Sequence, residues 1–263
     1  MSEHDFAALD SLQLLPRLLH GVAEPDTRVS LLGRELSAPL LPVGTHGDAL
    51  SDTAAGAAGT LGVVDAEALL RGGVDLSAFV ALLKPEKMGL LMPKVRKLAA
   101  GGVSGFALDL TAFADSWPFG GLEWHPRTRE DLAELRAAAG VPLWLYGVCS
   151  VSDAEVASEA GLEGVVVNTG AGVFLGASAT AEVFPDIFDA VAGTIAVYAG
   201  GAVRSGVDVF RYLALGAEAV LVDSDRSLLN LRAELAYTMR MTGCATLADI
   251  SYESIFAPLF GEV

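Results

Sequence analysis

The sequence predicts an α/β fold in which strand and helix alternate, and its eight candidate strands are the number in a single (β/α)8 barrel. Short apolar runs alternate with amphipathic helical stretches from about residue 38 onward. Glycine is abundant, with 29 residues, and aromatic residues make up only 7%, as in folds with tight turns between strands and helices. No linker or shift in composition divides the chain, so we expect one domain. An open doubly wound sheet is the alternative, because it is also a series of strand–helix units.

The elements follow in order along the chain. The candidate strands are Ala38–Val43, Leu61–Val64, Phe79–Leu83, Gly105–Leu108, Val141–Tyr146, Gly164–Val167, Ile195–Tyr198 and Ala219–Val222. Helices are expected at Ser51–Gly59, Gly89–Ala100, Arg129–Ala139, Ser152–Ala160, Ala181–Ala192 and Ser205–Leu215. The pairs Ser152 with Glu155 and Ser205 with Asp208 have the spacing of a capping box or its close relative, which predicts helix starts there.

Charge and cysteine content narrow the function classes. A formal net charge of −16 argues against nucleic acid and anionic membrane surfaces as partners. No apolar run is long enough for a membrane span, and the acidic N-terminus is no signal peptide. The two cysteines, Cys149 and Cys244, imply no disulfide framework, so a reducing cytoplasm is the expected location. We read both as buried structural residues rather than reactive thiols.

Active sites of such barrels lie at the carboxyl ends of the strands, so the polar residues at those ends are the candidates. They carry both signs of charge. They are Thr45, His46, Asp65, Glu67, Lys84, Asp109, Tyr146, Cys149, Asn168, Thr169, Arg204, Asp223 and Asp225. Strand ends are polar in every barrel, so about half of this ring is expected to have no special role.

The last βαβ unit carries the most specific motif. Gly200-Gly201-Ala202-Val203-Arg204 forms a glycine turn suited to an anion at the start of the following helix. With the stretch Ala214–Val222 and the tail around Thr242–Ile250, this segment resembles the C-terminal end of FMN-dependent α-hydroxy acid dehydrogenases, the lactate and glycolate oxidases. The resemblance favours the barrel over the open sheet.

The resemblance also implies a division of the chain. Residues 1–37 are expected to form a cap, with a helix from Asp10 to His20 and a hairpin-like segment at Leu31–Glu35 that closes the barrel bottom. Residues 38–250 would then form the barrel and residues 251–263 a C-terminal tail. The family tends to form higher oligomers, so a homo-oligomer is an option here.

Several family positions hold other residues in this chain. Tyr146 stands where the family has a lysine that stabilises reduced flavin. The family's Ser-Asn-His-Gly-Gly-Arg reads Val167-Asn168-Thr169-Gly170-Ala171-Gly172, which puts Thr169 at the catalytic base and Gly172 at the carboxylate-binding arginine. Gly200 replaces the aspartate that orients the histidine, whereas Arg204 is kept.

Other departures affect flavin contacts. Val80 and Leu82 match a Gln-x-Tyr pair that touches flavin and substrate, and Asp223–Arg226 replaces a phosphate-binding Gly-Arg. The loops after strands four and eight are shortened. A carboxylate at Asp223 would repel a phosphate, and threonine has no accessible pKa to act as a base. These departures predict no cofactor, with FMN as the disfavoured alternative, and no metal.

The sequence therefore predicts a flavin-less barrel enzyme that performs non-redox acid–base chemistry, as a lyase, isomerase or cyclase, on a small molecule. A non-catalytic descendant and an FMN-dependent oxidoreductase with an altered site are the alternatives. Tyr146, Asp109, Lys84 and His46 are the candidate catalytic residues. The candidate substrate-binding residues are Val80, Leu82, Asn168, Thr169 and Arg204, and the candidate anion site is Gly200, Gly201 and Arg204. Trp117, Trp124 and His125, in the shortened loop, are candidates for a lid or a loop anchor.

Overall fold

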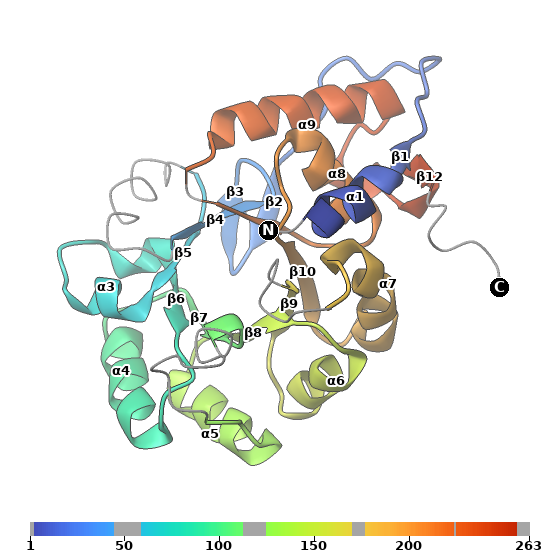
Figure 1. Ribbon diagram of the computed structural model, residues 1–263. Coiled ribbons are helices and arrows are strands. Elements are labelled where there is room, and N and C mark those ends of the chain that lie inside the picture. The colour runs from blue at the N-terminus through green and yellow to red at the C-terminus, as the bar shows by residue number, and fades with distance from the viewer. Residues whose placement is uncertain (1–2, 45–58, 113–124, 170–176, 224, 257–263) are drawn as a thin grey trace.

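The computed structural model describes residues 3–44, 59–112, 125–169, 177–223 and 225–256, and eight parallel strands in it close a barrel. Around the barrel the order is β4, β5, β6, β7, β8, β9, β10 and β11, with β11 pairing back onto β4. Figure 1 looks along this barrel, with the helices arranged around the outside of the strands. The predicted (β/α)8 barrel is confirmed, and the open sheet is excluded by the β11–β4 pairing.

The barrel strands lie close to their predicted positions, with shifts of one or two residues at their ends. They are β4 (Leu40–Gly44), β5 (Gly62–Asp65), β6 (Phe79–Leu83), β7 (Gly105–Asp109), β8 (Leu143–Val148), β9 (Gly164–Val167), β10 (Ala196–Gly200) and β11 (Val220–Asp223). The last strand ends at Asp223, one residue beyond its predicted end.

The helices in the described part of the chain cover the outer face of the barrel. They are α3 (Ala66–Leu70), α4 (Met88–Ala100), α5 (Arg129–Ala139), α6 (Val151–Glu159), α7 (Thr180–Val191), α8 (Gly206–Ala214) and α9 (Leu228–Thr242). Ser205 is the N-cap of α8, as predicted, and its side chain accepts the N–H of Asp208. The cap of α6 is Ser150 rather than Ser152, because the Ser150 side chain accepts the N–H of Asp153. The helix predicted at 51–59 lies almost entirely outside the described residues.

Strand β8 extends two residues beyond its predicted end. The register with β9 shifts between Tyr146 and Val148, and Gly147 at this bulge has a φ of +89°. A Cβ on Gly147 would lie 2.5 Å from the Thr111 side chain, so only glycine lets β8 pass so close to the segment after β7. The bulge carries the strand on to Val148 and sets the direction of the chain that leads into α6.

The barrel interior is filled by side chains from alternate positions of each strand, as the pleat of a strand requires. One buried apolar cluster contains these inward side chains together with Leu31 and Leu36. Those two leucines lie on the hairpin of β2 (Val29–Leu31) and β3 (Arg34–Leu36). The hairpin therefore closes the amino-terminal end of the barrel.

The N-terminal helix differs from the prediction. Helix α1 spans Glu3–Ser11 and is followed by strand β1 (Gln13–Leu14), which pairs with β12 (Ile255–Phe256). Pro16 lies inside the predicted helix and lacks the N–H that a helix interior needs, so the chain leaves helical geometry before it. Helix α1 packs beside α7 and α8 (Figure 1).

The described residues contain no helix that is both long and apolar enough to cross a bilayer.

Candidate active site

Side chains at the carboxyl ends of the strands form the candidate site, and strand alternation decides which of them face the barrel axis. Val166 and Tyr146 belong to the interior cluster, so two residues further along β9 the side chain of Asn168 also faces inward. Ala107 and Leu221 are interior residues in the same way, which places Asp109 and Asp223 on the inward side. The inward set at this end of the barrel therefore contains a phenol, an amide and two carboxylates.

Tyr146 and Asn168 form the best-defined contact of this set. The Asn168 amide Nδ2 donates to the Tyr146 hydroxyl at 2.8 Å, and both residues are buried. Burial raises the pKa of the Tyr146 phenol above its usual range, and the negative charges of Asp109 and Asp223 raise it further. Tyr146 is therefore a neutral hydroxyl at any physiological pH, able to donate or accept a hydrogen bond but not to act as a phenolate.

Asp109 is buried at the end of β7. Its Oδ1 accepts the backbone N–H of Thr111 at 2.9 Å and the Thr111 hydroxyl at 2.5 Å. These two bonds fix the carboxylate beside the neighbouring strand β8, where Asp109 is in register with Tyr146. The structure thus brings together Asp109, Tyr146 and Asn168, three of the residues expected from sequence.

Lys84 follows the end of β6 and is solvent-exposed. It continues the inward alternation of Val80 and Leu82, both of which are buried in the barrel interior. Val80 and Leu82 thus form part of the apolar filling of the barrel below the polar end. Their role as substrate-binding residues stays a prediction.

Thr169 does not lie among the inward residues. Its backbone N–H and its hydroxyl contact the Thr180 hydroxyl at 3.1 and 3.2 Å, and its hydroxyl lies 3.5 Å from the Asp5 carboxylate of α1. The side chain is therefore buried between the strands and helices α1 and α7. Thr169, predicted as a substrate-binding residue, therefore faces away from the barrel axis, because the residue after inward-facing Asn168 points outward.

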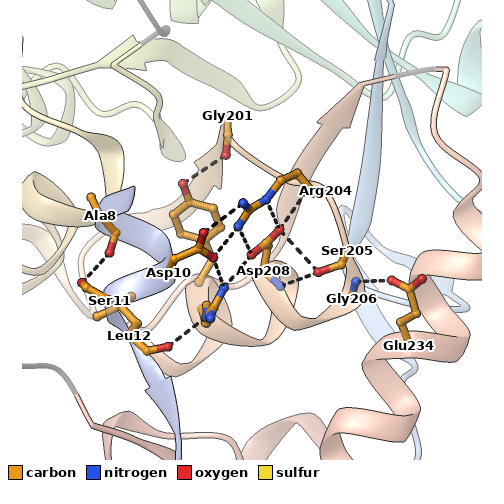
Figure 2. Close-up of polar contacts among 12 residues, drawn as sticks. Ala8, Asp10, Ser11, Leu12, Gly201, Arg204, Ser205, Gly206, Asp208 and Glu234 are labelled. Atoms are coloured by element: carbon orange, nitrogen blue, oxygen red, sulfur yellow. Dashed lines mark hydrogen bonds and ion pairs between the residues drawn. The ribbon is translucent and has the colours of Figure 1, made fainter. Parts of the chain in front are cut away.

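The donors that follow the glycine turn after β10 are paired with carboxylates of the chain itself (Figure 2), and the anion site predicted at Gly200, Gly201 and Arg204 stays a prediction. The N–H of Arg204 donates to Asp208 at 2.9 Å, and the N–H of Gly206 donates to Glu234 of α9 at 2.7 Å. The Arg204 guanidinium contacts both Asp208 and Asp10. With its side chain paired in this way, Arg204 in this arrangement is no open anion site.

The two glycines of the turn have another role. A Cβ on Gly200 would lie 3.2 Å from Asn168 Nδ2, and one on Gly201 would lie 3.1 Å from Asn168 Oδ1. Gly201 also has a φ of +86° and offers its carbonyl to the Tyr212 hydroxyl at 3.0 Å. The glycines therefore leave room for the Asn168 amide that holds Tyr146.

The structure describes only some of the remaining predicted residues. Thr45, His46, Gly172, Trp117 and Trp124 lie outside the described residues. Cys149 is half-buried, and its thiol contacts the carbonyls of Gly147 and Asn168. Burial raises the pKa of Cys149 to about 11, consistent with the expected unreactive thiol.

Comparison with known proteins decides the family. The profile of FMN-dependent dehydrogenases matches residues 114–257. An L-lactate oxidase from Alicycliphilus denitrificans is 30% identical over 95% of this chain and 86% of its own length. The chain belongs to the FMN-dependent dehydrogenase family. It is also 39% identical to an L-lactate oxidase from a Roseobacter species over 51% of this chain and 40% of that protein.

The fold agrees with this family. A solved structure of mandelate oxidase with (S)-2-phenylpropionate superposes with a TM-score of 0.78 over 94% of this chain and 88% of that one, at 24% identity. Among the curated relatives with the strongest matches, the chain spans less than half of the length, 40% to 46%. Its own activity is therefore treated below as a proposal.

Family membership corrects two expectations. The predicted flavin-less lyase or isomerase with no cofactor is wrong, because the matching family is FMN-dependent and the relatives that match are hydroxy acid oxidases. The interpretation of the departures at Tyr146 and Gly172 as a degenerate site without a cofactor does not agree with a family of FMN-dependent dehydrogenases. Of the alternatives left open by the sequence, the FMN-dependent oxidoreductase with altered residues agrees with these findings.

Two described residues at the polar end of the barrel offer hydrogen-bonding groups to the ring of FMN. An amide and a neutral phenol, Asn168 and Tyr146, stand at the end of an apolar barrel interior, which suits a planar heterocycle with a polar edge. The phosphate end is different, since the donors of Arg204 are engaged by Asp10 and Asp208.

Sequence reasoning missed the residues that engage Arg204. Asp10 is 194 positions away from it, and no local pattern predicts that contact. Asp208 was recognised only as a helix-capping residue. The one signal that could have pointed to it is its spacing, because Asp208 lies four residues after Arg204 and three before Arg211.

Proposed function

We propose that this chain is an FMN-dependent oxidoreductase that oxidises a small α-hydroxy acid, with site residues that differ from those of its relatives. Family membership carries the proposal. The polar end of the barrel supports it, because Asp109, Tyr146 and Asn168 converge there above an apolar interior. When bound, FMN supplies the two-electron acceptor that such an oxidation requires.

Asp109 is the proposed proton acceptor. It is a buried carboxylate at a strand end, held in place by the N–H and the hydroxyl of Thr111. Removing the hydroxyl proton of an α-hydroxy acid needs a base in contact with the substrate, and a carboxylate at this position meets that need in a chain whose Thr169 faces away. Its neighbour Tyr146 stays protonated and offers its hydroxyl for hydrogen bonding to the substrate.

Lys84 is the proposed partner for the substrate carboxylate. The residue lies at the exposed rim, on the inward side of β6 by alternation with Leu82. An ammonium group on a flexible stem can meet a carboxylate that enters from solvent. This assignment gives the site both a base and a cation without an arginine at position 172.

The experiment is to load the purified chain with FMN, follow quenching of flavin fluorescence, and then add lactate, glycolate or mandelate without oxygen. We expect one FMN per chain and bleaching of the flavin absorbance by at least one of these acids. Asp109→Asn should bind FMN and slow the bleaching by about 10²-fold, the usual effect of losing a positioned base. Asp189→Asn, at an exposed position on α7, is the matched control.

Two results would contradict the proposal. The first is a folded protein that takes up no FMN at saturating concentration. The second is Asp109→Asn bleaching at the rate of the Asp189→Asn control, which would move the base to another residue.

A further inference from the structure

Helix α1 buries one carboxylate together with its apolar face. The buried residues Asp5, Ala8, Leu9 and Leu12 have the spacing of one face of a helix. Its three apolar members belong to the main core cluster, so they anchor α1 to the barrel. Asp5 is only 6% exposed, and a buried charge is costly unless hydrogen bonds compensate for it. An acid on this otherwise apolar face therefore points to a specific task.

The Asp5 carboxylate faces hydroxyl groups behind the ends of β9 and β10. Its Oδ1 lies 3.5 Å from the Thr169 hydroxyl, which contacts the Thr180 hydroxyl at 3.2 Å. Burial raises the pKa of the Tyr212 phenol, and the negative charge of Asp5 raises it further. The charge of Asp5 therefore acts on three buried hydroxyl groups, one after β9, one on α7 and one on α8.

These hydroxyl groups hold backbone atoms next to Asn168. The Thr180 hydroxyl accepts the backbone N–H of Thr169 at 3.1 Å. The Tyr212 hydroxyl donates to the carbonyl of Gly201 at 3.0 Å (Figure 2). A Cβ at Gly201 would lie 3.1 Å from Asn168 Oδ1 and 3.9 Å from Thr180 Oγ1. The peptide after Asn168 and the turn that packs on its amide are thus both held from the side that faces α1.

The carboxylate gives the threonine hydroxyl bonds one direction, because a carboxylate only accepts. The Thr169 hydroxyl donates toward Asp5 and accepts from Thr180. Thr180 then keeps a lone pair for the Thr169 N–H. Without the acceptor at position 5, either threonine hydroxyl can donate to the other, and the bond to the Thr169 N–H loses this fixed partner.

We propose that Asp5 is a positioning residue of the active site, which acts on Asn168 through Thr169 and Thr180. By fixing the end of β9, it keeps the Asn168 amide donating to the Tyr146 hydroxyl. That bond occupies the phenol oxygen as an acceptor and directs its proton toward a substrate. The inference rests on the proposed function for the reaction, whereas the orientation of Asn168 can be measured without flavin.

The orientation of Asn168 has a direct spectroscopic readout. Asn168 and Asn230 are the only asparagines of the chain, so labelling with 15N-asparagine gives two side-chain NH2 pairs in the NMR spectrum. Asn230 is exposed on α9 and serves as the internal reference. In Asp5→Ala we expect the Asn168 pair to move toward the Asn230 pair. Its protons should exchange with water about fivefold faster, as for the loss of one hydrogen bond.

Two variants of Thr169 separate positioning from packing. Thr169→Val keeps the shape of the side chain and removes the hydroxyl, whereas Thr169→Ser keeps the hydroxyl. We expect Thr169→Val to change the Asn168 pair as Asp5→Ala does, and Thr169→Ser to leave it in place. Asp10→Ala is the control for the attachment of α1, because it removes two ion pairs of this helix and leaves the Asp5 carboxylate intact.

With FMN bound, the same variants test the effect on the reaction. At saturating hydroxy acid, flavin bleaching should slow about tenfold in Asp5→Ala and Thr169→Val, because a misplaced group lowers the rate of the chemical step. The acid concentration that gives half of the maximal rate should change less than about twofold, since Lys84 still meets the substrate carboxylate.

The inference is overturned if the Asn168 pair of Asp5→Ala matches that of the unmodified chain, or if Thr169→Ser or Asp10→Ala changes it as much as Thr169→Val. It is also overturned if the unmodified chain reduces FMN and Asp5→Ala bleaches at the same rate. A chain that takes up no FMN but shows the expected change at Asn168 would contradict the proposed function and support the positioning role of Asp5.

Discussion

Replacing Asp208 by Asn should destabilise the protein far more than the same change at Asp10, although both carboxylates contact the same two arginines. The Asp208 carboxylate accepts the N–H of Arg204 at 2.9 Å, two guanidinium bonds from Arg204 at 3.2 Å and one from Arg211 at 2.8 Å. The side chain is only 1% exposed. An amide in its place keeps the shape, removes the charge and turns one acceptor into a donor that faces other donors.

The expected loss of unfolding free energy follows from the burial of Asp208. Breaking a buried ion pair by removing one partner costs about 3–5 kcal/mol, and we expect the lower end, about 3 kcal/mol, because both arginines keep Asp10. That corresponds to a fall in Tm of about 6–12 °C for a chain of this size. Asp10→Asn removes a half-exposed partner and should cost at most about 1 kcal/mol.

Urea unfolding and thermal melts of both variants and of the double variant provide the measurement. We expect the double variant to lose less than the sum of the two single losses, since both acids share Arg204 and Arg211. Equal losses for Asp10→Asn and Asp208→Asn, or a loss below about 1 kcal/mol for Asp208→Asn, would refute the reasoning from burial.

Three further outcomes can be checked separately. Gly206→Ala should lower Tm by several degrees, because its Cβ would lie 2.2 Å from the backbone N of Leu235, whereas Gly89→Ala in α4 meets no atom within 4 Å and should be neutral or stabilising. Cys149 should react slowly with iodoacetamide at pH 8, since burial raises its pKa to about 11, and rapid alkylation in the folded state would contradict that. Because burial raises the pKa of Tyr146 in the folded state, the unfolded phenol ionises first, so stability should fall as pH rises above about 10. Tyr146→Phe should reduce that loss, and an unchanged alkaline unfolding profile would argue against the shift.

The fold could be read from the sequence because each barrel strand is a short apolar run with its own local signal. The helix predicted at Asp10–His20 was wrong because its apolar residues are not buried on a helix face. Leu15, Leu18 and Leu19 have helical spacing, yet all three are exposed in the structure, and Pro16 among them excludes a helix interior. The segment instead follows β1, whose position depends on pairing with β12 at the far end of the chain. No local property of the sequence encodes that pairing.

The candidate site was predictable to the extent that alternation along strands determines it. Tyr146, Asp109 and Asn168 follow inward-facing residues on their strands, so their direction was implicit in the sequence. The same rule sends Thr169 outward, and applying it would have excluded Thr169 from the mouth. Comparison of motifs residue by residue placed the Thr169 side chain on the wrong side of the strand, because it did not take into account that successive side chains alternate between inward and outward.

The glycine turn after β10 shows what a sequence motif can and cannot specify. The turn and the helix start after it present N–H groups and a guanidinium, and buried donors of this kind must be paired. The sequence therefore predicts that an anion lies there, but it does not say whether a ligand or a distant carboxylate supplies it. In this chain Glu234, Asp208 and Asp10 do so, from α9, α8 and α1. Two of these three are anchored in elements that build the barrel, whereas Asp10 belongs to a short helix at its rim.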